Sequence, residues 1–373
     1  MTDVFLFIST HLKKTLVLIL TTLTILGYAS ESPDSIHSRG SLFVIPSATY
    51  QPETSVAPGL AYGYYFKSED LSKISSITGS TVYTFHNQFL FNITPKIYFN
   101  TDKCYIYSNL NIRNHPDYYY GIGNKPTLTK QAYTALNISF LIQPQYIVSN
   151  YFYVGASFSS RYERTLTDDS YELNKRNIFS KYGNEGWSPF TQTSVGLVAA
   201  FDNRDNQFYP EHGCFAKTTY STSKKGLGSN YSLQEFTLDI RQYIPIFGTH
   251  LLAWQTYYSG VFGQNGIPFQ LLPSIGGIDK LRGFRQGMYR DNVMMLFQTE
   301  YRLPIYKRLK GTLFCSVGDV MKSVDYKVDK LKMGYGVGLR YRLNDARVHL
   351  RLDIAKNNYG DKLQIYLTAS EAF

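Results

Sequence analysis

The stretch Arg347–Lys356, RVHLRLDIAK, decides the fold because its side chains alternate with a period of two. The apolar set is Val348, Leu350, Leu352 and Ile354, and the polar set is Arg347, His349, Arg351 and Asp353. Successive side chains of a strand point to opposite faces, so the stretch predicts a strand with one apolar and one polar face. The same alternation recurs in GYGVGLRYRL (334–343) and LQIYLTAS (363–370), and it continues nearly everywhere after residue 40.

Such strands fit either a soluble sandwich or an outer-membrane barrel, and three further features favour the barrel. Many runs reach about ten residues, the span of a tilted transmembrane strand. Tyr and Phe gather near strand ends, as in a membrane-interface girdle. Short and long connections alternate, as they do between the two sides of an outer membrane. The short ones fall near 100–103, 245–248, 304–308 and 344–345, and the long ones at 114–130, 166–187, 262–290 and 320–330.

We therefore predict an all-β fold, a transmembrane antiparallel β-barrel of about sixteen strands. Both chain ends and the short turns then lie in the periplasm, and the long loops lie outside. The link 202–212 is the one overlong periplasmic connection. The expected strands are 41–50, 58–67, 74–85, 88–99, 103–113, 131–146, 151–163, 189–201, 213–223, 230–244, 250–262, 291–303, 309–319, 332–343, 347–356 and 363–373.

The N-terminus differs from the rest of the chain. Lys13 and Lys14 precede an apolar run from Leu16 to Leu26, followed by small residues ending at Ala29. This pattern predicts a signal peptide over residues 1–29, a short periplasmic segment over 30–40 and a barrel over 41–373. An uncleaved anchor is the alternative, but the apolar run is shorter than the roughly 20 residues that span a bilayer.

Composition and scattered polar residues exclude several function classes. The net charge is +10, yet export argues against nucleic acid as a partner. The three cysteines are odd in number and far apart, which predicts free thiols. We expect no catalytic residue, cofactor or metal: the histidines lack ligand spacing, and Ser316 with His349 has no supporting context. Asp202, Asp205 and Glu211 offer a weak calcium alternative to a capped turn.

The segment GGIDKLRGFRQGMYRDN (276–292) lies between the eleventh and twelfth expected strands and is too long and basic for an ordinary turn. Its Gly276-Gly277 pair and its Arg282-Gly283-Phe284 tripeptide occur in order with FDNRDNQFYPEHG (201–213), LFQTEYRLPI (296–305), YYYGIGN (118–124) and a terminal Phe373. In this set the chain resembles the BamA/TamA superfamily of outer-membrane assembly and secretion barrels, the bacterial surface antigen family.

The resemblance implies that this external loop folds back into the lumen, where Arg282 meets inward-facing acids of the barrel wall. Glu300 has the right parity to point inward. The family's second acid is replaced by Ser316, and Asp319 has the opposite parity, so it can substitute only through a bulge. The expected lock is therefore Arg282 with Glu300, assisted by the Ser316 hydroxyl. The resemblance also marks Phe373 as a C-terminal assembly signal.

Two further expectations concern the lumen and the partners. Arg340, Arg342, Arg347 and Arg351 share the predicted lumen face of two adjacent strands, where they either favour anions or are balanced by carboxylates. The segment before the first strand leaves no room for a POTRA module. The expected partners are outer-membrane lipid, client barrel proteins and a separate periplasmic protein.

The sequence leaves three functions open for a barrel in the outer membrane of a Gram-negative bacterium. The first is assistance in the insertion or export of outer-membrane and surface proteins, through a weak seam between the first and last strands. Pro46 in the first strand lacks an N–H donor, which suits such an edge. The second is a gated pore for small solutes or lipids, with the 276–292 loop as plug. The third is a structural surface antigen.

Overall fold

The computed structural model describes residues 41–51, 55–66, 73–83, 88–100, 102–125, 131–166, 186–263, 266–323, 331–343, 347–368 and 371–373. The expected signal peptide and the segment 30–40 lie outside these residues. In the described part of the chain, no helix is long and apolar enough to cross a membrane.

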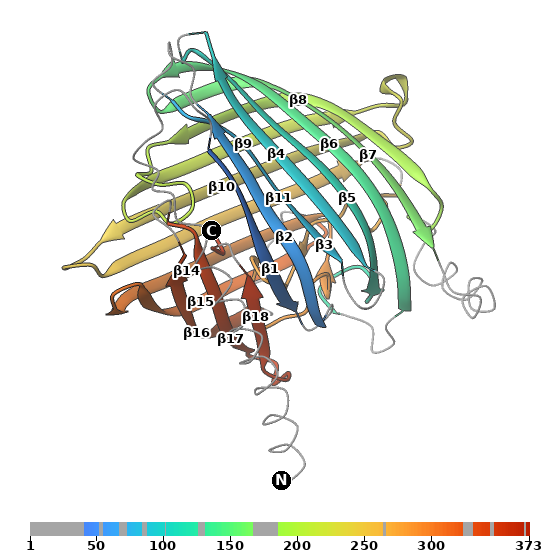
Figure 1. The fold of residues 1–373 in the computed structure, drawn as a ribbon. Helices are drawn as coiled ribbons and strands as arrows, with labels where there is room; N and C mark the ends of the chain where they lie inside the picture. The colour runs from blue at the N-terminus through green and yellow to red at the C-terminus, as the bar shows by residue number, and fades with distance from the viewer. Residues whose placement is uncertain are drawn as a thin grey trace.

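Sixteen antiparallel strands close into one barrel, as the sequence predicts (Figure 1). The first eight are β1 (Ser41–Gln51), β2 (Ser55–Phe66), β3 (Ser75–Tyr83), β4 (Phe89–Phe99), β5 (Cys104–Tyr119), β6 (Gln131–Ser149), β7 (Phe152–Leu166) and β8 (Phe190–Asp202). The others are β9 (Gly213–Ser223), β10 (Leu233–Pro245), β11 (Leu251–Gly263), β14 (Val293–Tyr306), β15 (Leu309–Met321), β16 (Lys332–Arg342), β17 (His349–Asn357) and β18 (Gln364–Thr368). A short helix, η3 (Lys225–Leu227), and a two-stranded sheet of β12 (Ser274–Ile275) and β13 (Tyr289–Arg290) lie in loops.

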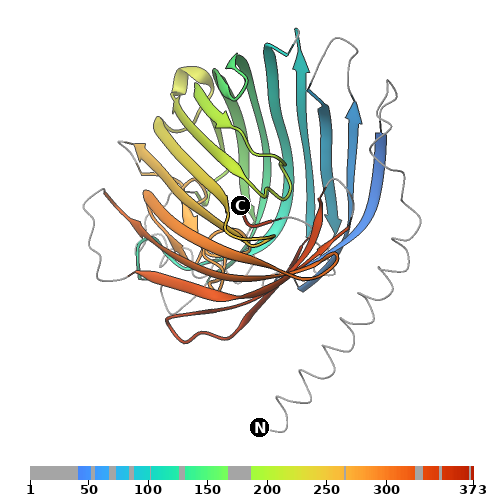
Figure 2. The ribbon, with the colours of Figure 1, turned by 90° about the vertical axis from the view of Figure 1, so that its left-hand side faces the viewer.

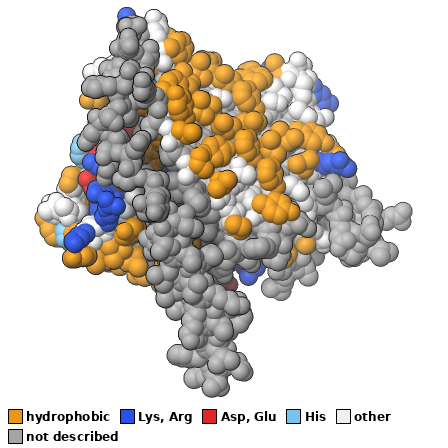
Figure 3. Space-filling model, viewed as in Figure 1, with side chains coloured by type: hydrophobic (Ala, Val, Ile, Leu, Met, Phe, Trp, Pro, Cys, Tyr) orange, Lys and Arg blue, Asp and Glu red, His pale blue; other side chains and the backbone are white. Residues whose placement is uncertain are grey.

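The period of two in the sequence becomes an apolar outside and a polar lumen. On β16, Tyr335, Val337 and Leu339 are exposed, whereas Lys332 and Arg340 are buried inside. The space-filling view shows hydrophobic side chains gathered over the strands of one outer face (Figure 3). This arrangement places apolar side chains where lipid would lie and polar ones in a wet interior.

The barrel has two different ends. At one end, called here the turn end, most links are short, such as the one between Tyr306 and Leu309. At the other, the loop end, the long loops connect the strands, including the segment 264–292 between β11 and β14. The wall is also uneven in height: β6 has 19 residues and β5 has 16, but β17 has 9 and β18 has 5.

The last strand is shorter than the sequence suggested. We expected it to reach residue 373, but β18 ends at Thr368. The described residues that follow turn into the barrel (Figures 1 and 2), where Ala372 and Phe373 pack on Tyr243. Glu371 is drawn to the lumen by Arg340, whose Nε lies 2.8 Å from its Oε2. The other clear difference is β5, which continues to Tyr119 instead of ending near residue 113.

We predict that Leu197→Arg lowers the free energy of unfolding in lipid by about 2–4 kcal/mol. Leu197 lies in the middle of β8 with 68% of its surface exposed on the outer face. The matched control is Ser159→Arg on the adjacent strand β7, opposite Ser194, because its side chain faces the lumen and can stay in water. Urea unfolding in lipid vesicles measures both variants. Equal losses would contradict the assignment of the two faces.

Candidate functional site

The segment 266–292 folds into the barrel and packs against its inner wall. Within it, β12 and β13 pair at Ser274 with Arg290 and at Ile275 with Tyr289. Its apolar side chains form a buried cluster with the wall residues of β14 and β15. The cluster contains Ile275, Leu281, Phe284, Tyr289, Met294, Leu296 and Val320. Phe284, the aromatic residue of the tripeptide, therefore fixes the loop by burial, with 1% of its surface exposed.

The loop glycines allow this close approach. Gly276, Gly277 and Gly283 all have positive φ, at 105°, 95° and 102°. A Cβ on Gly283 would lie 2.7 Å from the carbonyl oxygen of Lys356, and one on Gly276 would overlap the carbonyl of Arg285. The backbone N–H of Gly277 donates to the carbonyl of Phe284 at 2.9 Å and closes the hairpin-like fold of the segment. Only glycine fits such conformations without strain.

Arg282 lies at the centre of the site and is fully buried. Its Nη2 lies 2.6 Å from Oε1 of Glu300, and its Nη1 lies 2.6 Å from Oδ2 of Asp353. The guanidinium also stacks over the Phe314 ring at 3.6 Å. One loop side chain thus bridges carboxylates on β14 and β17, with charge-assisted hydrogen bonds to each.

Asp353 is the second acid of the lock, and the sequence reasoning missed it. Ser316 and Asp319, which were considered for that position, bind other residues. The Ser316 hydroxyl donates to Oε1 of Gln298 at 3.3 Å. Asp319 binds Nζ of Lys332 at 2.6 Å and accepts a hydrogen bond from Asn124 at 2.9 Å. The sequence pattern could have identified Asp353 as facing the lumen, because it lies on the polar face of the alternating stretch 347–356 together with Arg351.

The lock belongs to a larger buried ion network that balances the lumen arginines. Glu300 also accepts a hydrogen bond from Nε of Arg302 at 2.9 Å. Arg340 contacts Asp353 at 2.5 Å and Glu371 at 2.8 Å. The network contains four cations and four anions: Arg282, Arg302, Arg340 and Arg351 with Asp279, Glu300, Asp353 and Glu371. Of the two interpretations of the arginine face, the structure shows balance by carboxylates.

The inserted loop takes part in that balance, although it is rich in basic residues. Its Asp279 lies 3.3 Å from Nη2 of Arg351. The expected row of four arginines is also broken. Arg347 precedes β17 in the turn and pairs with Asp205 and with Glu211, the latter at 3.4 Å. Arg342 closes β16 and is only half-buried.

A second anchor holds the other limb of the loop. Phe269 is buried in an aromatic cluster with Tyr119, Tyr133 and Trp187, at ring distances of 4.7 to 5.3 Å. The guanidinium of Arg290 lies 5.2 Å from the Phe269 ring. The backbone carbonyl of Arg290 accepts a hydrogen bond from the N–H of Gly123 at 2.7 Å, so the stretch YYYGIGN contacts the loop directly.

The overlong link 203–212 closes part of the turn end. Tyr209 is fully buried there, stacks on His349 at 4.1 Å and lies beneath Arg302 at 4.8 Å. Burial would raise the pKa of Asp205, but hydrogen bonds from the N–H groups of Glu211 and His212 and the ion pair with Arg347 hold it below its usual value. Asp202, in turn, binds Arg204 at 2.8 Å. These carboxylates thus cap and pin a turn, and the described residues contain no group of ligands arranged for a metal ion.

Phe373 lies in the lumen near this turn, with 4% of its surface exposed, and its ring is 5.9 Å from the Arg302 guanidinium. The imagined pair of Ser316 and His349 is engaged elsewhere: Nδ1 of His349 contacts the Arg347 carbonyl at 2.8 Å.

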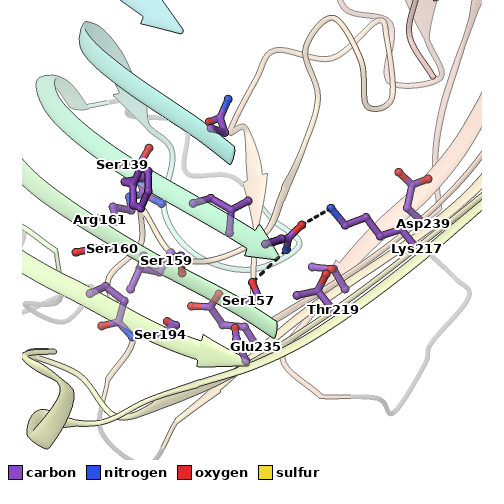
Figure 4. A pocket seen from close by; sticks show the side chains of 18 of the residues that line it. Ser139, Ser157, Ser159, Ser160, Arg161, Ser194, Lys217, Thr219, Glu235 and Asp239 are labelled. Atoms are coloured by element: carbon purple, nitrogen blue, oxygen red, sulfur yellow. Dashed lines mark hydrogen bonds between the residues drawn. The ribbon is translucent and has the colours of Figure 1, made fainter. Parts of the chain in front are cut away.

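The rest of the lumen contains a polar chamber of about 510 Å³, bounded by β5 to β11 and by Leu271 of the loop (Figure 4). Its lining is rich in hydroxyl and amide groups. In the view, Lys217 and Asp239 lie at one end, and Ser139 and Arg161 lie at the other. We call this space the lumen chamber. The inserted loop therefore fills one side of the barrel and leaves the other open.

Comparisons with known proteins agree with this architecture. The family model described as the Omp85 superfamily domain matches residues 74–373. Among solved structures, BamA from Haemophilus ducreyi lacking POTRA domains 1–3 is similar with a TM-score of 0.58 and 13% identity, over 88% of this chain and 70% of that one. CdiB from Acinetobacter baumannii is similar with a TM-score of 0.53 and 12% identity, over 88% of this chain and 59% of that one. A search of curated protein sequences finds no significant match. The match to more than half of its residues shows that the chain belongs to the Omp85 superfamily of outer-membrane barrels.

Proposed function

We propose that this barrel assists the insertion or export of outer-membrane and surface proteins, and that it does so without enzymatic chemistry. The observation that carries the proposal is the seam between β1 and β18. Among the described residues, these strands pair at one position, Tyr50 with Leu367. By contrast, β1 and β2 pair over eleven positions, from Ser41 with Tyr65 to Gln51 with Ser55.

A weakly paired strand edge in a membrane favours hydrogen bonding with another strand. Backbone N–H and C=O groups that face lipid without a partner each cost several kcal/mol, so such an edge gains from adding another strand. Client proteins that are themselves barrels carry such strands. The proposed action is therefore templating of a client strand on the β1 edge, in the outer membrane of a Gram-negative bacterium, with a separate periplasmic protein delivering clients.

The loop lock supports this proposal because it stiffens the wall next to the seam. Arg282 joins β14 to β17, and β17 is the neighbour of β18. A Cβ on Gly334 of β16 would overlap the Arg282 carbonyl, and the Tyr366 hydroxyl of β18 accepts the Gly283 N–H at 3.1 Å. With Phe314 of β15 beneath the guanidinium, the tripeptide adjoins the wall strands β14 to β18. If the strands on the β18 side of the seam are fixed, β1 can move relative to them and open the seam.

The first prediction concerns the lock. In cells depleted of this protein and complemented with Arg282→Ala, we expect several unrelated outer-membrane barrels to fall together several-fold, as in the uncomplemented depletion. Leaving buried carboxylates short of a partner costs about 3–5 kcal/mol, which favours release of the loop. Quantitative outer-membrane proteomics measures the result.

The matched control is Arg241→Ala, which removes another lumen arginine, paired with Asp239 at 2.6 Å, away from the loop lock. It should complement like the wild type. Heat-modifiable migration in gels shows that both variant barrels are folded. An unchanged proteome in folded Arg282→Ala would contradict the role of the lock, and an unchanged proteome after depletion would contradict the function itself.

The second prediction concerns the seam. With Cys104, Cys214 and Cys315 replaced by Ser, a disulfide between Tyr50→Cys and Leu367→Cys should block client assembly, and a reductant should restore it. Directly opposite positions on paired strands are close enough for a disulfide. The control is Thr49→Cys with Ala57→Cys, across the continuous β1–β2 ladder, which should have no effect when oxidised. Full assembly with an oxidised seam would rule out a seam that opens.

A gated pore is the second candidate, favoured by the lumen chamber that remains beside the inserted loop. This function predicts that planar bilayers with the wild-type barrel conduct weakly and that deleting 276–289 increases the conductance several-fold. The deletion removes Arg282 and the lock that holds the loop in the lumen. Silent bilayers with both proteins would exclude the pore.

A further inference from the structure

The wall of the lumen chamber offers hydrogen-bonding groups that nothing else in the described structure uses. Five hydroxyls face this region without a side-chain hydrogen bond among the described residues: Ser159, Ser194, Thr219, Ser221 and Thr237. They come from four consecutive strands, β7 to β10. A volume of about 510 Å³ falls in the range of small-molecule sites.

Three lysines at the turn end of this half of the lumen lack a carboxylate partner in the described residues. Nζ of Lys217 contacts Oε1 of Gln143 at 2.7 Å, and Nζ of Lys96 contacts Oε1 of Gln207 at 2.8 Å. Nζ of Lys73 contacts the Tyr153 hydroxyl at 3.1 Å. All three ammonium groups therefore hydrogen-bond to neutral oxygens, and none forms an ion pair with a described carboxylate.

Two nearby acids compensate these lysines only in part, because each already binds an arginine. Asp239 accepts from Arg241 at 2.6 Å, and Asp202 accepts from Arg204 at 2.8 Å. Glu235 on the chamber wall lies opposite Ser221, four residues along β9 from Lys217. Lys217 is close enough to Lys96 for the two charges to repel. Asp239, opposite Lys217, shares its attraction with Arg241, and a bound anionic group would offset the remaining repulsion between the lysines.

Tyrosine rings accompany these cations. Tyr98 and Tyr105 stack at 4.7 Å, and Tyr105 meets Tyr153 edge-on at 5.7 Å. Nζ of Lys217 lies 4.8 Å from the centre of the Tyr107 ring. These rings pack against one another and beneath the ammonium groups, so they hold the lysines in place at the turn end of this half of the lumen.

We propose that this half of the lumen binds an acidic oligosaccharide. Its carboxylates or phosphates would lie at Lys217 and the neighbouring Lys96, and its hydroxyls would lie against the serine and threonine wall. A simple inorganic anion would leave the hydroxyl wall unused, and a neutral sugar would leave the lysines without an ion-pair partner. Because β4 to β10 separate the site from lipid, the ligand is a soluble oligosaccharide and not a membrane-anchored glycolipid.

The test uses the full-length barrel in lipid nanodiscs and calorimetric titration with trigalacturonate. We expect saturable binding that weakens as salt is added, and at least tenfold weaker binding of maltotriose, its uncharged counterpart. Lys96→Gln and Lys217→Gln should each weaken trigalacturonate binding by about tenfold, the effect of losing one charged hydrogen bond. The control is Lys225→Gln, an exposed lysine in η3 at the loop end, which should bind like the wild type.

Three results would overturn the proposal: no saturable binding of trigalacturonate to the folded wild type, an equal loss in Lys225→Gln, or tighter binding of a Ser-rich acidic peptide than of trigalacturonate. The last would make the chamber a passage for polypeptide. Heat-modifiable migration of each variant ensures that a loss of binding is not a loss of folding.

Discussion

The loop side of the lumen depends on one buried guanidinium that two carboxylates share. Arg282 stays charged at any physiological pH, and burying such a group costs several kcal/mol unless acids surround it. Glu300 and Asp353 supply those acids from β14 and β17, so the loop can enter the barrel only in the register that brings Arg282 between them. The glycines at 276 and 283 and the burial of Phe284 follow from that position, because the backbone must then lie directly on the wall.

The charge balance of the network has a consequence for motion of the loop. The wall contributes Arg302, Arg340 and Arg351 together with Glu300, Asp353 and Glu371, and the loop contributes Arg282 together with Asp279. Wall and loop are each neutral within the network. Withdrawal of the loop therefore breaks specific hydrogen bonds but leaves no net charge in this network. Geometry, more than net electrostatic attraction, holds the loop in place, which is the arrangement that a releasable plug or brace requires.

Much of the fold could be predicted from the sequence, since a period of two reports directly which face of a strand meets lipid. The site was less accessible. Glu300 could be placed by parity because it lies in a long regular strand, but Asp353 was overlooked although its parity was equally clear. Its distance from Arg282 depends on how the barrel closes, and local patterns carry no information about that. The inward turn of Glu371 and Phe373 was hidden for the same reason, because it is caused by Arg340 on another strand.

The ion network and the weak seam are physically connected through the C-terminus. A glutamate in continuation of β18 would have to be accommodated near lipid, where charges are expensive, whereas Arg340 offers it a compensated place inside. By leaving the wall, residues 371–373 give up positions at which they could have paired with β1. Pro46 on β1 has no N–H to donate in any case. The same electrostatic attraction that completes the lumen network thus shortens β18 to five residues and limits its described pairing with β1 to Leu367 and Tyr50. The weak pairing at the seam therefore depends on the ion pair between Glu371 and Arg340. A change in the charge of the network would alter how β18 pairs with β1.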